Sequence, residues 1–273
     1  MQTLKSNLLH LDGSARCVER IRVARQLAET FDAKVTGLYG VTPSRTRYSI
    51  AAPDSSVIAG DFVTVDQEER DRAHAVFAAE SAGAPLPSWS ELEDCTPRGF
   101  AWHTIYSDLM LLGQRDSNGS AFDETPSDFL PSLLIETGRP ALVLPHTGTI
   151  APIGRTVLVA WKQTRESARA VSAALPWLCR AEHVHVMAFG YDPDPALQAL
   201  QDYLLCHGVI TTLHRGAPQE EGVGERLLSK ASNLGADLLV MGCYGRSRSR
   251  EWIFGGATRT VLETMTLPVL MAH

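Results

Sequence analysis

The sequence contains one pattern of strands and helices twice, and this repeat limits the possible folds more than any other feature. The matching apolar segments are residues 8–14 and 157–164, 34–39 and 183–188, 107–113 and 236–242, and 139–144 and 267–272. The offset falls from 150 residues at the first pair to 129 at the third. The first half therefore holds about 21 additional residues, for which the Ser-, Pro- and Thr-rich residues 42–61 are the expected place.

Helical patterns separate these apolar segments. Residues 15–30 follow Ser14, and residues 165–179 follow Thr164, each in the N-cap position, while a third helix over residues 220–233 is expected to end at Gly235. Strands that alternate with helices and are apolar almost throughout are typical of a parallel sheet covered on both faces. We therefore predict an α/β chain of two tandem Rossmann-like domains, each a five-stranded parallel sheet with helices on both faces. The expected domains are residues 1–147 and 153–273.

Composition excludes several classes of partner. The formal charge is −6 and the pI is about 5.8, so the long-range field repels nucleic acid. The five cysteines show no C-x-x-C spacing, which argues against a disulfide framework or a structural zinc site and favours a reducing compartment. No window approaches eighteen apolar residues, and residues 1–11 do not have the pattern of a signal peptide. We expect no membrane span and a cytoplasmic location.

The segment richest in chemical information follows the buried strand at residues 238–241. It carries Gly242, Gly245, Gly255 and Gly256, with Thr258 in the first turn of the helix that begins there. Glycines at the carboxyl end of a strand let backbone N–H groups approach an anion, and a helix N-terminus adds a positive dipole. Two interpretations remain open, because the same glycines also serve to shape a turn and to let a helix pack closely on a strand.

These residues resemble the universal stress protein family, whose nucleotide-binding members carry G-x-x-G, nine residues, then G-[S/T]. Gly242, Gly245 and Gly255 match that spacing, Gly256 stands at the Ser/Thr position, and Thr258 stands where many members have a further Thr. The likeness covers nearly the whole chain as two tandem domains. It implies a role in stress tolerance and binding of ATP or a related nucleotide.

Neither half carries the complete site of that family. In the family an Asp at the end of the first strand helps to hold the adenine and ribose, and Asp12 matches it, but the loop after Gly113 lacks the later glycines. The second half keeps the loop and has Lys162 in place of the Asp. The resemblance therefore implies at most one nucleotide per chain. The candidate binding residues are Gly242, Gly245, Arg246, Gly255, Gly256, Thr258, Trp161, Lys162 and Ala188.

Aromatic and arginine side chains near this segment have two interpretations each. Arg246, Arg248 and Arg250 are suited either to clamping a triphosphate or to an ordinary solvated loop. Trp161 and Phe189 end neighbouring strands, where they either flank a base or pack in the core.

Other reactive side chains do not assemble into a catalytic set. His183 and His185 share a strand face without a third ligand at a useful spacing, so we expect no metal site. Cys243 is either a redox-sensitive thiol or an ordinary buried one. No general base, nucleophile or metal set emerges, and slow nucleotide hydrolysis is the most enzymatic activity that the sequence suggests.

Two further functions remain open, namely a sensor of a non-nucleotide acidic metabolite or lipid headgroup, and a ligand-free interaction scaffold. Members of the family pair their last strands across a two-fold axis. We therefore expect residues 141–144 to pair with residues 269–272, which would give a pseudo-dimer within one chain. Homodimerisation through the outer surfaces also remains open.

Overall fold

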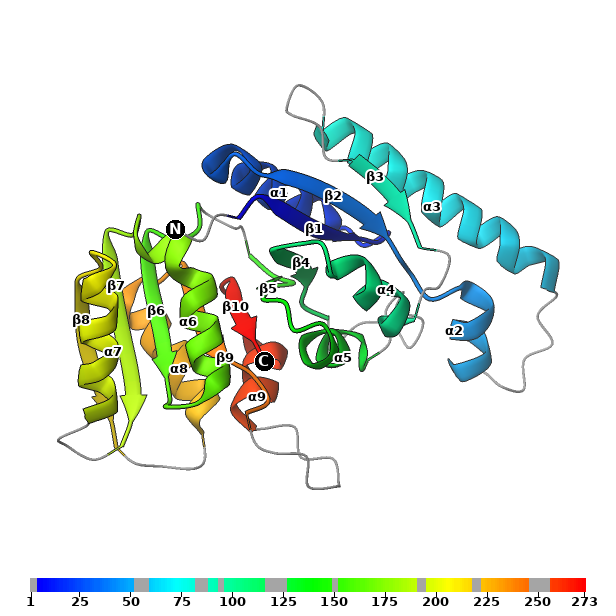
Figure 1. The fold of residues 1–273 in the computed structure, drawn as a ribbon. Coiled ribbons are helices and arrows are strands. Elements are labelled where there is room, and N and C mark those ends of the chain that lie inside the picture. The colour runs from blue at the N-terminus through cyan, green and yellow to red at the C-terminus, as the bar shows by residue number, and fades with distance from the viewer. Residues whose placement is uncertain are drawn as a thin grey trace. The chain divides into compact units, whose positions relative to one another are not determined.

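The computed structural model describes residues 4–51, 59–81, 88–92, 96–115, 127–148, 152–190, 195–217, 222–245 and 256–273. Strands and helices alternate along the chain, which confirms the predicted α/β class (Figure 1). The chain divides into two compact units, an N-terminal unit of Leu4–Arg139 and a C-terminal unit of Pro140–His273 with Met1–Thr3. The domain limits at residues 147 and 153 follow from the repeat rather than from compactness, and they stay a prediction.

The N-terminal unit contains a parallel sheet with the strand order β3-β2-β1-β4. Its elements are β1 (Ser6–Leu11), α1 (Cys17–Phe31), β2 (Lys34–Tyr39), α2 (Ser44–Ala51), α3 (Ala59–Ser81), β3 (Ser88–Glu91), α4 (Pro97–Thr104), β4 (Leu109–Gly113) and α5 (Phe129–Glu136). α1 packs on α3, and α4 packs on α5. The central strands β1 and β4 are buried almost throughout, as their apolar sequences predict.

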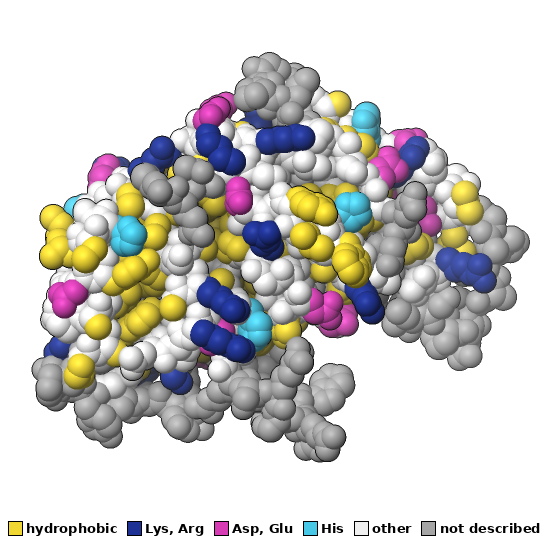
Figure 2. All heavy atoms as spheres, in the orientation of Figure 1, with side chains coloured by type: hydrophobic (Ala, Val, Ile, Leu, Met, Phe, Trp, Pro, Cys, Tyr) yellow, Lys and Arg dark blue, Asp and Glu magenta, His cyan; other side chains and the backbone are white. Residues whose placement is uncertain are grey.

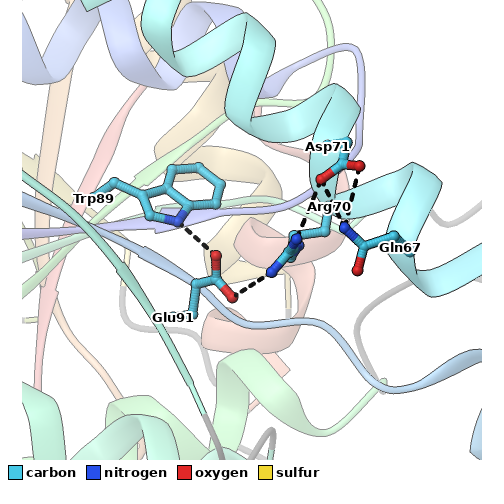
Figure 3. Close-up of polar contacts among 5 residues, drawn as sticks. All are labelled: Gln67, Arg70, Asp71, Trp89 and Glu91. Atoms are coloured by element: carbon cyan, nitrogen blue, oxygen red, sulfur yellow. Dashed lines mark hydrogen bonds and ion pairs between the residues drawn. The ribbon is translucent and has the colours of Figure 1, made fainter. Parts of the chain in front are cut away.

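The additional residues of the first half form helix. α2 and the 23-residue α3 stand where the second half has a single helix of 12 residues. The second half of α3 contacts β3 through Trp89, which lies edge-on to His74 of the helix and stacks on Tyr39 of β2 at a centroid distance of 5.5 Å. Figure 3 shows the polar side of this contact, where the carboxylate of Glu91 accepts hydrogen bonds from Trp89 Nε1 and from Arg70. The long helix is thereby anchored to the edge strand.

The C-terminal unit contains six strands in the order β5-β10-β9-β6-β7-β8. Its elements are β5 (Ala141–Leu144), β6 (Thr156–Trp161), α6 (Arg165–Leu178), β7 (His183–Phe189), α7 (Pro195–Cys206), β8 (Thr211–Gly216), α8 (Val223–Leu234), β9 (Leu238–Gly242), α9 (Gly256–Thr264) and β10 (Val269–Ala272). The five strands from β10 to β8 run parallel, as predicted for this half. α8 packs against α9, and α6 packs against β9 and β10.

The last strand of each half pairs with the other. β5 runs antiparallel to β10, with Val143 opposite Val269 and Ala141 opposite Met271. This confirms the predicted strand pairing. By sequence β5 is the fifth strand of the first half, as predicted, although compactness groups it with the C-terminal unit. Of the helices in the described part of the chain, none has the length and apolar character needed to cross a membrane.

Candidate functional site

The carboxyl ends of β6 and β9 lie side by side in the C-terminal unit. Their parallel register pairs Ala160 with Met241, so the chain leaves both strands at the same edge of the sheet. Beyond β6, Thr164 caps α6, and its Oγ1 accepts a hydrogen bond from the Ser167 N–H at 3.3 Å. The predicted cap is thus confirmed, and α6 packs against β9.

Gly242 ends β9 directly against the first turn of α6. A Cβ atom at this position would lie 2.5 Å from the Ser167 nitrogen and 2.7 Å from the Glu166 carbonyl carbon. Only a residue without a side chain fits so close to a helix backbone. At Gly242, therefore, the close-packing interpretation has direct support, and the glycine brings the positive end of α6 to the loop.

Gly245 lies next to the carboxylate of Glu166. A Cβ atom on Gly245 would be 3.0 Å from Glu166 Oε2, and Glu166 is only 3% exposed. Burial acts to raise the pKa of this carboxyl group, but hydrogen bonds, chiefly from Arg165 Nε, hold the pKa below its ordinary value. Glu166 is therefore ionised at neutral pH, which places a negative charge beside a loop expected to receive phosphate.

Tyr244 and Thr258 join the loop to α9. The Tyr244 N–H donates to Thr258 Oγ1 at 3.4 Å, and Thr258 is only 4% exposed. Tyr244 has a φ of 53°, a left-handed conformation that is strained for a residue with a side chain. The hydroxyl of Thr258, which the sequence suggested for a phosphate contact, is thus already bonded to the loop. Gly256, the first residue of α9, is exposed.

The remaining candidates lie at the ends of β6 and β7 or outside the described residues. Trp161 is partly exposed, but its indole Nε1 is buried and has no hydrogen-bond partner among the described residues. Lys162, directly after it, is exposed, and Ala188 is buried beside Trp161 in register. Arg246 and Gly255 fall outside the described residues, as do Arg248 and Arg250.

Trp161 and Phe189 do not flank one pocket. The register pairs Trp161 with Ala188, so its side chain shares the face of Ala188, and Phe189 points to the opposite face. Phe189 instead lines a groove of about 450 Å³ between β7, β8 and α8. The groove has apolar side chains on the sheet and charged and polar ones on the helix, namely Met187, Phe189, Gly216, Glu225, Arg226, Ser229, Lys230 and Asn233.

The histidines of the second half gain a neighbour that the sequence did not indicate. His214 on β8 lies 3.1 Å from His185, measured from Nε2 to Nδ1. Burial lowers the pKa of both imidazole rings, and the charge of Lys230 lowers both further. Within the described residues, no group of three or more His, Cys, Asp or Glu could hold a metal ion. His183 and His185 are therefore not joined by a third metal ligand within that part of the chain.

Cys243 has the properties of a buried thiol. It is 1% exposed, and burial, assisted by the charge of Glu166, raises its pKa to about 12. A thiol with this pKa is protonated at neutral pH and is a poor nucleophile. The structure therefore favours the ordinary buried thiol over the redox-sensitive one.

The corresponding strand end of the N-terminal unit is closed by an ion pair. Asp12 Oδ1 lies 2.5 Å from Arg20 Nη2, and Arg20 Nε donates to the backbone oxygen of His10. The backbone N–H of Ser14 also donates to Asp12. Burial opposes ionisation of Asp12, but Arg20 outweighs it and lowers the pKa of Asp12 to about 2. The Arg20 guanidinium also fills the space at Gly113, where a side chain would begin.

The fold and the strand-end loop define a class of protein, the tandem Rossmann-like α/β proteins. No protein-family profile matches the sequence, and no curated protein matches it significantly. Among solved structures, a universal stress protein from Archaeoglobus fulgidus DSM 4304 covers 99% of this chain and 99% of its own, with a TM-score of 0.70 and 16% identity.

Two structures from Pseudomonas aeruginosa are also similar along nearly the whole chain. A candidate universal stress protein from strain UCBPP-PA14 covers 98% of this chain and 93% of its own, with a TM-score of 0.58 and 17% identity. A functionally unknown protein from strain PAO1 covers 98% and 92%, with a TM-score of 0.58 and 16% identity. At these identities the likeness establishes the fold, and this chain has the tandem universal stress protein fold.

Proposed function

We propose that this protein is a tandem universal stress protein that binds one ATP-like nucleotide in its C-terminal unit and acts in the stress response. The observation that supports this most directly is the position of the Gly242–Gly245 loop. It lies between the capped N-terminus of α6 and the first turn of α9, to which Tyr244 is bonded. Two helix N-termini at one loop direct positive dipoles toward it, which favours an anion.

A second feature supports a ligand at this sheet edge. The buried Trp161 Nε1 has no partner among the described residues, and a buried donor without an acceptor costs about 1–3 kcal/mol. An acceptor atom of a bound ligand would satisfy it. Lys162, exposed next to it, adds a positive charge at the same strand end.

The titratable groups at the loop support binding rather than catalysis. Burial raises the pKa of the Cys243 thiol and of the Tyr244 phenol, so both groups are protonated at neutral pH. The ionised carboxylate of Glu166 is engaged by Arg165. None of the three is prepared to act as a nucleophile. We propose no efficient catalysis, with slow hydrolysis of a bound nucleotide as the upper limit.

The proposed stoichiometry is at most one nucleotide per chain. The Oδ1 atom of Asp12, whose carboxylate the family uses for adenosine, is held by Arg20 and Ser14, and the carboxylate is buried in the N-terminal unit. Titration calorimetry with ATP should therefore give a stoichiometry of one or less, and mass spectrometry of the purified protein should detect a nucleotide. Two equivalent ATP sites would contradict the stoichiometry, and no binding of ATP, ADP, AMP or adenosine would overturn nucleotide binding.

The groove between β7, β8 and α8 favours a second candidate function, a sensor of an amphiphilic acid. Met187 and Phe189 provide apolar surface there, and Arg226 and Lys230 provide positive charge. This pattern suits a carboxylate on an apolar body. Native mass spectrometry that finds a bound organic acid, lost in Arg226→Ala, would favour this candidate over the nucleotide.

Location and assembly belong to the same proposal. Four cysteines of the described chain are free thiols, two of them exposed, as suits the reducing cytoplasm. The β5–β10 pairing supports an internal pseudo-dimer, and a homodimer through other surfaces remains open. On the face in Figure 2, Lys and Arg side chains lie among Asp and Glu, without the continuous basic field that nucleic acid requires.

A further inference from the structure

The proposed anion site of the C-terminal unit already contains an anion, the side chain of Glu166. This residue lies in the first turn of α6, two positions after the cap Thr164. A carboxylate there interacts favourably with the positive end of the helix dipole, as a bound anion would. Glu166 is 3% exposed, so its charge faces the loop rather than solvent.

The contact at Gly245 shows how near this charge is to any ligand of the loop. The space that a Cβ atom of Gly245 would occupy is 3.0 Å from Glu166 Oε2. A phosphate oxygen in van der Waals contact with Gly245 on this side would therefore approach the carboxylate closely. Two like charges about 5 Å apart at an effective dielectric constant of about 20 repel enough to change an affinity roughly one-hundred-fold.

Among the described residues, Arg165 is the cation bonded to Glu166, and Lys162 is a second, exposed cation at the same strand end. Arg165 Nε donates to Glu166, but the Arg165 side chain is 71% exposed, so solvent screens much of its charge. The retained negative charge is also felt by Cys243, whose pKa it helps to raise. The loop is thus less attractive to polyanions than its helix N-termini alone would make it.

We propose that Glu166 is an internal anion that sets the ligand specificity of the loop, so that the site prefers adenosine compounds with one negative charge or none to triphosphates. This inference rests on the proposed nucleotide function and narrows its ligand class. The glycine spacing that resembles an ATP site is retained, but the space beside Gly245 is occupied by the protein's own carboxylate. Glu166 acts on binding, and it takes no part in a reaction.

The test compares Glu166→Gln with Glu182→Gln, which removes the same charge from an exposed residue paired with Arg155. Calorimetry in buffer containing a chelator measures inorganic triphosphate, ATP and adenosine. Glu166→Gln should tighten triphosphate and ATP about ten-fold or more and change adenosine less than two-fold. Glu182→Gln should leave all three within two-fold. Glu166→Asp, which withdraws the charge by one methylene, should give a smaller gain and serves if the Gln variant does not fold.

Each outcome decides a different claim. If triphosphate binds Glu166→Gln no more tightly than wild type, or not at all, the inference is overturned, whatever adenosine does. An equal gain in Glu182→Gln would also overturn it, because the effect would then come from net charge. If triphosphate binds Glu166→Gln more tightly than wild type, while ATP binds no better than triphosphate and adenosine does not bind, the selection of charge by Glu166 stands. The nucleotide function then fails, together with the preference for adenosine compounds.

Discussion

The strand-end sites of the two units have opposite arrangements of charge, with an acid at the end of β1 and a lysine at the end of β6. In the N-terminal unit, the acid at the strand end is Asp12, and Arg20 from the following helix lies on it. In the C-terminal unit, the residue at the strand end is Lys162, and the charge that the following helix contributes is Glu166. The first pair is buried and directly bonded, whereas Lys162 is exposed and Glu166 faces the loop.

This difference separates a structural role from a ligand-binding one. A buried ion pair resists opening, because either charge alone would be buried without a partner. An anion at a helix N-terminus, as Glu166 is at α6, occupies a place that another anion can take. We therefore expect the N-terminal site to contribute to stability and the C-terminal site to select a ligand. Substitutions at the two sites test this difference, from the largest expected effect to the smallest.

The largest effect is expected from Arg20→Met. The substitution leaves Asp12 buried without its partner, which should cost about 3–5 kcal/mol in the free energy of unfolding. Urea denaturation followed by circular dichroism measures it. Arg22→Met in the same helix is the control, because Arg22 is exposed, and its loss should cost less than about 1 kcal/mol. Equal losses in both variants would contradict a structural role for the Asp12 pair.

The pH dependence of stability should show the same ion pair. The pKa of Asp12 is about 2 in the folded chain, below the ordinary 3.8. Its stabilisation is therefore complete above pH 4 and is lost as the pH falls from about 4 to 2, and it amounts to about 2–3 kcal/mol. Denaturation curves between pH 5 and 2 should show this loss in wild type and a flatter profile in Asp12→Asn. A wild-type profile as flat as that of the variant would exclude the assigned pKa.

The two glycines of the C-terminal loop should respond unequally. Gly242→Ala places a methyl group against the fixed backbone of α6 and should destabilise the protein by about 1–3 kcal/mol. Gly245→Ala meets only the end of the Glu166 side chain, which can shift, and should cost less than about 1 kcal/mol. Thermal unfolding of both variants provides the measurement. A greater loss for Gly245→Ala would reverse the roles that the contacts assign.

The smallest effect concerns the adenosine end of the proposed site. Lys162→Asp restores the acceptor that the resemblance places at this position. It should raise the ratio of adenosine affinity to triphosphate affinity about ten-fold, the equivalent of one charge-assisted hydrogen bond. Lys162→Ala, which removes the cation without adding an acceptor, is the control and should leave adenosine affinity within two-fold. A ratio that is equal in the two variants would show that the family's adenine geometry does not apply here.

Much of the fold could be predicted from sequence because its signals are local. Apolar runs of strand length, the N-cap Thr164 and the terminal Gly235 each act within a few residues, and the structure has strands and helix ends there. The expected N-cap Ser14 was wrong, because α1 begins at Cys17 and Ser14 bonds Asp12 instead. The alternation of strands and helices then implied the parallel sheets, and the family resemblance implied the pairing of β5 with β10. Compactness groups β5 with the C-terminal unit, because its pairing with β10 joins strands that are distant in sequence.

The candidate site was predicted only in part, and the physical reason is distance in sequence. The glycine spacing identified the loop, but Gly242 lies against the backbone at Ser167, and Gly245 lies against Glu166, about 80 residues earlier. Glu166 and Arg20 appeared in the sequence as ordinary charges near the start of helices. Only the tertiary structure buried them and brought them to a glycine, and burial is what turns a solvated charge into one that selects a ligand or holds a fold.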